Sequence, residues 1–252
     1  MNMKEIAKRG LESLDLTSLN DTDTDQTTID LCAKSHGDFG HTAAVCVWPR
    51  FVALAKKELA GTPVRIATVV NFPHGSTDVE ATVAETTQAI KDGADEIDVV
   101  LPYKAFMSGD KAAAKALLTA TRAACGDKTM KVIIESGVLA HADLIAEASK
   151  LSIECGADFI KTSTGKTPVS ATPEAANVML EVIRDSGKPV GFKASGGVKT
   201  TAQAGEYMAL ADKIMGPEWI SLMTFRFGAS GLRDALIASL NGDDSVKSTS
   251  AY

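Results

Sequence analysis

Short β-rich runs return along this chain at intervals of about thirty residues, and no other feature restricts its fold as strongly. A strand, a helix and two short loops need about that much chain, so each interval predicts one βα unit. The runs are Leu11–Leu16, Thr42–Val47, Val64–Val70, Ile97–Leu101, Val132–Glu135, Phe159–Thr162, Val190–Ala194 and Phe225–Gly228.

Helix-like segments rich in Ala, Glu, Lys and Leu separate these runs, for example Asp78–Asp92, Asp143–Cys155 and Thr172–Ser186. Eight alternating units without a compositional break predict one α/β domain, a closed (β/α)8 barrel or TIM barrel. The competing fold is a doubly wound open sheet. We expect the barrel to occupy residues 1–240 and the polar residues 241–252 to form a mobile tail.

The composition argues against several classes of protein. With 26 Lys and Arg residues against 32 Asp and Glu, the net charge is −6 and the pI is near 5.3, whereas a nucleic-acid-binding surface is normally basic. No apolar run is long enough to cross a bilayer and the N-terminus has mixed charge, which predicts a cytoplasmic protein without a membrane partner. The cysteines form no CxxC pair and the histidines no metal motif, so we expect reduced thiols and no metal.

Alternation of side chains along the predicted strands places charged residues inside the barrel. Apolar residues such as Ile97, Val99 and Phe192 occupy the row that faces the helices. Charges in the other row cost several kcal/mol unless they are paired, so either a structural ion-pair network or a functional site must explain each of them. The inward row contains Cys46, Asp98, Glu135, Lys161, Lys193 and Arg226.

Two of these inward residues, Lys161 and Lys193, lie on adjacent predicted strands. Their charges repel, so stability alone does not favour the pair. An ordinary lysine, with a pKa of about 10.4, is almost wholly protonated at neutral pH, whereas a neighbouring cation and desolvation lower that pKa. We therefore predict that one lysine is a nucleophile and the other its electrostatic partner. Asp98 would either move protons through water or balance Lys193.

Loops rich in small residues follow three late strands: Thr162–Lys166, Ser195–Gly197 and Gly228–Gly231. Glycine lets a backbone approach an anion closely, and late loops of these barrels often bind phosphate. Each loop alone is more typical of an ordinary turn. Together they predict a phosphorylated substrate.

Five segments of the chain together form a recognisable set of motifs: Asp15–Thr17, Thr42–Arg50, Asn71–Gly75, Phe159–Lys166, and Gly191–Lys193 with Gly196–Gly197. In these segments the chain resembles the deoxyribose-phosphate aldolase family. The resemblance runs from about residue 11 to residue 231 and includes a terminal tyrosine. It implies a class I, Schiff-base aldolase that reversibly cleaves 2-deoxy-D-ribose 5-phosphate to acetaldehyde and D-glyceraldehyde 3-phosphate without metal or cofactor.

The resemblance also implies roles for individual residues. Lys161 matches the Schiff-base lysine, Lys193 the lysine that perturbs it, Asp98 the acid of the proton relay, and Tyr252 a tail tyrosine that assists proton transfer. Ala194-Ser195 stands where the family has Pro-Ala, and Gly231 where it has a second serine. The expected substrate-binding residues are Asp15, Cys46, Thr164, Gly165, Lys166, Gly196, Gly197 and Ser230.

Several alternatives remain open from the sequence alone. Asp15 either bonds a substrate hydroxyl or caps local backbone, and Cys46 is either a reactive thiol or a small buried hydrophobe lining the donor pocket. A phosphosugar isomerase on the same barrel would need a carboxylate or histidine base but no amine nucleophile. A non-catalytic phosphosugar-binding protein would release no aldehyde. A monomer and a homodimer are both compatible with the sequence.

Overall fold

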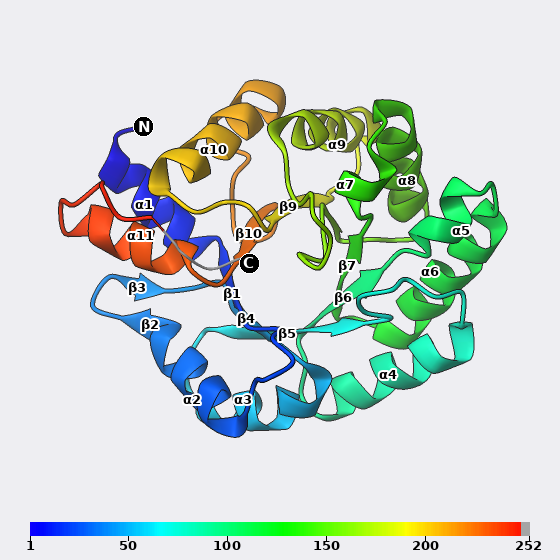
Figure 1. Ribbon diagram of the computed structural model, residues 1–252, viewed down its shortest axis with the longest axis horizontal. Helices are drawn as coiled ribbons and strands as arrows, with labels where there is room; N and C mark the ends of the chain where they lie inside the picture. The colour runs from blue at the N-terminus through cyan, green and yellow to red at the C-terminus, as the bar shows by residue number, and fades with distance from the viewer. Residues whose placement is uncertain (248–252) are drawn as a thin grey trace.

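The computed structural model describes residues 1–247, which form a closed barrel of eight parallel strands surrounded by helices (Figure 1). The first barrel strand, β1, pairs with both β4 and the last strand, β10, so the sheet has no free edge. This closure confirms the predicted (β/α)8 barrel and excludes the open sheet. The barrel strands are β1 (Leu14–Thr17), β4 (Ala44–Val47), β5 (Arg65–Val70), β6 (Glu96–Val100), β7 (Thr129–Ile133), β8 (Phe159–Lys161), β9 (Gly191–Ser195) and β10 (Phe225–Ala229).

The helices lie around the outside of the barrel (Figure 1). None of those within residues 1–247 combines the length and the apolar character needed to cross a membrane. Their bounds are α1 (Met3–Glu12), α2 (Asp25–Lys34), a 3-10 turn (Pro49–Phe51), α3 (Val52–Glu58), α4 (Val79–Lys91), α5 (Tyr103–Met107), α6 (Lys111–Cys125), α7 (Ser136–Leu139), α8 (Ala142–Glu154), α9 (Pro173–Ser186), α10 (Thr201–Met215) and α11 (Leu232–Leu240).

Short polar side chains start most of the long helices. Asp78, Asp110 and Thr172 each accept a hydrogen bond from the backbone N–H three residues further on, at the starts of α4, α6 and α9. These caps satisfy backbone donors that have no partner inside the helix. At its other end α9 stops at Gly187, whose left-handed conformation (φ 64°) suits glycine. Capping side chains therefore fix where these helices begin, and a glycine fixes where α9 ends.

The N-terminal region differs from the prediction. Residues Met3–Glu12 form α1, and β1 begins at Leu14, so Leu11 belongs to the helix and not to the first strand. Asn2 and Glu5 close a reciprocal capping box at the start of α1. Ala7 and Leu11 are buried, and α1 packs against α10 and α11. A two-stranded hairpin, β2 (His36–Gly37) and β3 (Gly40–His41), also precedes β4.

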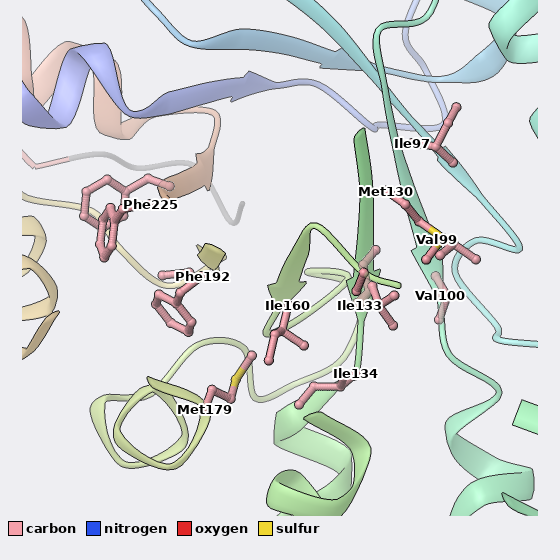
Figure 2. Close-up of a cluster of buried hydrophobic side chains, with 14 of the residues drawn as sticks. Ile97, Val99, Val100, Met130, Ile133, Ile134, Ile160, Met179, Phe192 and Phe225 are labelled. Atoms are coloured by element: carbon pink, nitrogen blue, oxygen red, sulfur yellow. The ribbon is translucent and has the colours of Figure 1, made fainter. Parts of the chain in front are cut away.

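Apolar packing is concentrated between the barrel wall and the helices. Ile97, Val99, Ile160 and Phe192 are fully buried on the outer row, and Figure 2 shows Met179 of α9 beside Phe192 and Ile160. Burial of such side chains is the main favourable term in folding. Because this apolar layer between the strands and the helices supplies the hydrophobic core, the interior of the barrel can carry polar groups.

Two strands start earlier than the sequence predicted. β6 begins at Glu96, and β7 runs over Thr129–Ile133, so Val132 is near its end and Glu135 lies beyond it in a left-handed conformation (φ 54°). The register pairs Asp98 with Lys131 on the neighbouring strand. By the two-residue alternation, Glu96 and Lys131 therefore join the inward row.

Candidate active site

Seven charged side chains with no exposed surface fill the barrel interior; we call them the charge cluster. They come from five consecutive strands, β6 to β10, and from β1, which is distant in sequence but pairs with β10 in the ring. Burying a charge is costly, so each must be paired. The cluster consists of Asp15, Glu96, Asp98, Lys131, Lys161, Lys193 and Arg226.

Arg226 anchors one part of the charge cluster. Its Nη1 lies 2.6 Å from Asp15 Oδ1, and its Nη2 lies 2.9 Å from Glu96 Oε1. Lys131 Nζ approaches the other oxygen of Glu96 at 2.6 Å. The guanidinium carbon of Arg226 is 5.4 Å from the centre of the Phe159 ring, a cation–π arrangement. Every charge in this part therefore has a partner of opposite sign.

Asp98 organises the other part of the charge cluster. Its Oδ2 accepts hydrogen bonds from Lys161 Nζ at 2.9 Å and from Lys193 Nζ at 2.8 Å, while its Oδ1 accepts one from Lys131 at 2.8 Å. Lys193 also donates to Asp15 Oδ2 at 2.5 Å. Lys161 and Lys193 are in register on β8 and β9, so the two amines expected to be neighbours meet on one carboxylate oxygen.

The ion pairs dominate the titration of the carboxyl groups. Burial by itself raises the pKa of Asp98, but Lys131, Lys161 and Lys193 outweigh it and hold that pKa well below 3.8. The same balance between burial and cations lowers the pKa values of Asp15 and Glu96. For Lys193, burial favours the neutral amine, but Asp15 and Asp98 raise its pKa above 10.5. Lys193 is therefore a fixed cation at neutral pH.

These shifts predict that acid destabilises the protein. The folded pKa values of Asp15, Glu96 and Asp98 lie below their ordinary values of 3.8 and 4.5, so their stabilising contribution is complete above about pH 5 and is lost as the pH falls. Glu135, whose pKa is raised by burial, opposes this trend. We expect the urea midpoint to drop between pH 5 and about pH 3. A midpoint that stayed constant over that interval would contradict the assigned ion pairs.

The part of the barrel wall formed by β4 and β5 carries small, apolar side chains. Cys46 packs with Leu19, Ala44, Ala67 and Val69 in a cluster separate from the main core. Burial is the largest cause that raises the pKa of the Cys46 thiol, so this side chain is a small hydrophobe at neutral pH and not an activated nucleophile. Charged groups thus occupy one part of the interior, and small apolar ones another.

Asp15 has contacts that the sequence did not predict. Its carboxylate pairs with Lys193 and Arg226 and does not cap local backbone, so the capping alternative is wrong. Contact between Asp15 and a substrate hydroxyl stays a prediction. Glu96 and Lys131 were missed as members of the site. Both could have been found by extending the predicted strands toward the N-terminus. One residue before Ile97 is Glu96, and two residues before Ile133 is Lys131.

Glu135 shapes the loop that follows Lys161. The backbone N–H of Thr164 donates to Glu135 at 3.2 Å, and the Thr164 hydroxyl donates to its second carboxylate oxygen at 2.5 Å. Further along, Gly165 has a φ of 77°, and Lys166 Nζ donates to the Leu19 carbonyl at 2.6 Å. The loop therefore bridges from the end of β8 to the loop after β1.

The other expected phosphate positions also lie beyond the carboxyl ends of the strands. Gly196 and Gly197 directly follow β9 and have positive φ angles of 73° and 81°, a conformation that favours glycine. Ser230 lies between β10 and α11. Tyr252 is outside the described residues. Among residues 1–247, no group of three or more His, Cys, Asp or Glu residues could hold a metal ion.

Comparison with protein families assigns this geometry to a known group of enzymes. The chain matches the model of the DeoC/LacD family aldolases over residues 11–236. It belongs to this aldolase family. The match covers all eight barrel strands and every member of the charge cluster, so the family assignment and the buried amines concern the same part of the chain.

Solved structures of similar proteins agree with this family. A candidate deoxyribose-phosphate aldolase from Toxoplasma gondii is 25% identical, with a TM-score of 0.87 and 96% of each chain covered. One from Coccidioides immitis is 30% identical, with a TM-score of 0.83, 93% of this chain and 86% of that chain covered. The fold is also shared with deoxyribose phosphate aldolase from Aeropyrum pernix, described as tetrameric, at 21% identity and a TM-score of 0.76, with 94% and 92% covered.

Proposed function

We propose that this aldolase works through a Schiff base on Lys161 and reversibly cleaves 2-deoxy-D-ribose 5-phosphate to acetaldehyde and D-glyceraldehyde 3-phosphate. The observation that carries the proposal is the meeting of two lysine amines on one oxygen of Asp98. An amine nucleophile needs a neutral form at working pH, and a fixed cation beside it favours that form.

The charge cluster separates Lys161 from the groups that are fixed cations. Nearby carboxylates raise the pKa values of Lys131 and Lys193, and Arg226 remains charged at any ordinary pH. Lys161 shares Asp98 Oδ2 with one of these cations, Lys193, and it is the residue that matches the Schiff-base lysine of the aldolase family. We therefore assign Lys161 as the nucleophile.

The first half of the reaction follows from a neutral Lys161. Its lone pair attacks the aldehyde carbon of the open-chain sugar, giving a carbinolamine, and loss of water gives an iminium ion. The bond between the second and third carbons then breaks, and its electrons form a neutral enamine. The hydroxyl on the third carbon loses its proton and becomes the aldehyde of glyceraldehyde 3-phosphate, which leaves.

The second half returns the enzyme to its starting state. The enamine takes a proton on its terminal carbon to give the iminium of acetaldehyde, and water hydrolyses this to acetaldehyde and free Lys161. Asp98 contacts both amines and has the position needed to pass protons to and from the nitrogen and the carbinolamine oxygen. Its lowered pKa means that it holds such a proton only briefly.

The proposed substrate fits the two ends of the site. The small apolar wall at Ala44, Cys46 and Ala67 suits the methyl group of acetaldehyde. Gly196 and Gly197 present backbone at the mouth, with Ser230 close to the N-terminal turn of α11, where phosphate is favoured. These features of the protein support a short aldehyde donor and a phosphorylated acceptor.

Trapping the intermediate tests the proposal directly. Incubation with acetaldehyde followed by borohydride should attach a stable ethyl group to Lys161, which peptide mass spectrometry would locate. An isomerase using a carboxylate base would remain unmodified while keeping its activity. A protein that only binds phosphosugars would release no aldehyde from 2-deoxyribose 5-phosphate in a coupled assay. Either result would overturn the Schiff-base proposal.

A further inference from the structure

The hydroxyl of Ser195 has no hydrogen-bond partner among the described residues, although the residue has no exposed surface. The backbone around it is fully engaged: the Ser195 N–H donates to Thr162 Oγ1 at 3.0 Å, and its carbonyl accepts from Ala171 N–H at 3.3 Å. A buried hydroxyl without a partner is unfavourable, because it has lost its bonds to water. Nothing within residues 1–247 compensates for the missing bond.

The position of Ser195 places this hydroxyl inside the barrel. It follows Lys193 by two residues on β9, so both side chains belong to the inward row. On β10, its register partner is Gly228. A side chain at Gly228 would overlap both Ser195 Oγ and Lys193 Cε, so these two atoms lie on the same side of that glycine. The hydroxyl therefore stands beside the lysine that bonds Asp98.

The direction along the strand places Ser195 between the two halves of the proposed site. Lys193, with the amine pair, lies below it, and Gly196 with Gly197 lies above it at the strand end. In open-chain 2-deoxyribose 5-phosphate, the third and fourth carbons, which lie between the aldehyde and the phosphate, each carry a hydroxyl group. A substrate bonded to Lys161 with its phosphate at the glycines must run its hydroxyl-bearing carbons past this level.

We infer that Ser195 is a substrate-binding residue whose hydroxyl bonds a secondary hydroxyl of the sugar chain between the reacting carbon and the phosphate. This inference rests on the proposed function. Filling the missing bond on binding turns an unfavourable buried group into a favourable contact, so the residue lowers the stability of the free protein and raises affinity. A serine here also gives preference for hydroxylated acceptors over simple aldehydes.

The test compares two proteins that both carry Lys161→Leu, one with Ser195 and one with Ser195→Ala. Because Lys161→Leu removes turnover, calorimetry measures binding alone. We expect 2-deoxyribose 5-phosphate to bind roughly five- to tenfold more weakly after Ser195→Ala, the value of one ordinary hydrogen bond. Inorganic phosphate, used as a separate probe, should bind equally to both. The melting temperature of the free protein should be unchanged or higher.

Ser136→Ala is the matched control. Its hydroxyl is also buried without a partner, but the residue begins α7 after β7, two strands away from β9 around the ring, so its loss should leave sugar-phosphate binding unchanged. Equal binding by the Ser195→Ala protein would overturn the inference, and weaker binding of inorganic phosphate would assign Ser195 to the phosphate instead. If the Lys161→Leu protein bound no 2-deoxyribose 5-phosphate, either with Ser195 or with Ser195→Ala, both the proposed substrate and the proposed role of Ser195 would be overturned.

Borohydride trapping with acetaldehyde separates this inference from the proposed mechanism. Acetaldehyde has no secondary hydroxyl, so Ser195→Ala alone, with Lys161 present, should be labelled as fully as the unchanged protein. Failure of labelling in the unchanged protein would count against the Schiff base, whereas the binding comparison bears on Ser195 alone.

Discussion

Replacing Lys161 by leucine is expected to abolish cleavage of 2-deoxyribose 5-phosphate, with a loss of about 10⁴-fold or more in kcat. The two other amines on Asp98, Lys131 and Lys193, have raised pKa values and stay protonated, so they do not replace it as nucleophile. Leucine has similar volume and no charge, and it leaves three carboxylates facing three cations in the charge cluster. The fold should therefore survive. Rate measurement, together with circular dichroism to check the fold, gives the result.

Lys161→Arg is the control that separates nucleophilicity from charge. Arginine keeps a cation near Asp98 but does not lose its proton in proteins, so it cannot attack an aldehyde. We expect this variant to be as inactive as Lys161→Leu. Activity within tenfold of the unchanged enzyme in either variant would rule out Lys161 as the Schiff-base residue.

Replacing Arg226 by methionine is expected to give the largest loss of stability, about 3–5 kcal/mol in the free energy of unfolding. The guanidinium is buried and bonds both Asp15 and Glu96, so its removal leaves two carboxylates short of a cation. Methionine preserves much of the apolar volume against Phe159. Urea unfolding at pH 7 measures the change.

Arg65→Met provides a matched control for this loss. Arg65 also pairs with Glu96, at 3.3 Å, but its side chain is 33% exposed, so solvent already screens the interaction. We expect a change below about 1 kcal/mol. Similar losses in the two variants would show that burial of Arg226 is not what makes its ion pairs important.

The repeating pattern of strands and helices was enough to predict the barrel, since apolar residues on the outer row mark most strands clearly. Ile97, Val99 and Phe192 face the helices as expected. The N-terminal strand was misplaced because Leu11 is equally apolar in a helix facing α10 and α11. Hydrophobicity alone does not distinguish these two settings for a short segment.

The site was harder to predict because charged residues interrupt the strands that carry it. Lys131 breaks the apolar run of β7, so the predicted strand began after it and extended too far, to Glu135. Asp98, Lys161 and Lys193 were found because each lies within a predicted strand, whereas Lys131 lies just before one. Which carboxylate each lysine contacts depends on barrel closure and register, which no local pattern encodes.

The seam between β1 and β10 has a consequence for synthesis on the ribosome. Asp15 and Arg226 bond across this seam although 211 positions separate them in the chain. Until the last barrel strand has emerged, the first lacks one hydrogen-bonded neighbour, and Asp15 lacks its guanidinium. A nascent chain therefore cannot acquire partial activity step by step; the reaction chamber comes into being only after β10 has been translated and the ring can shut.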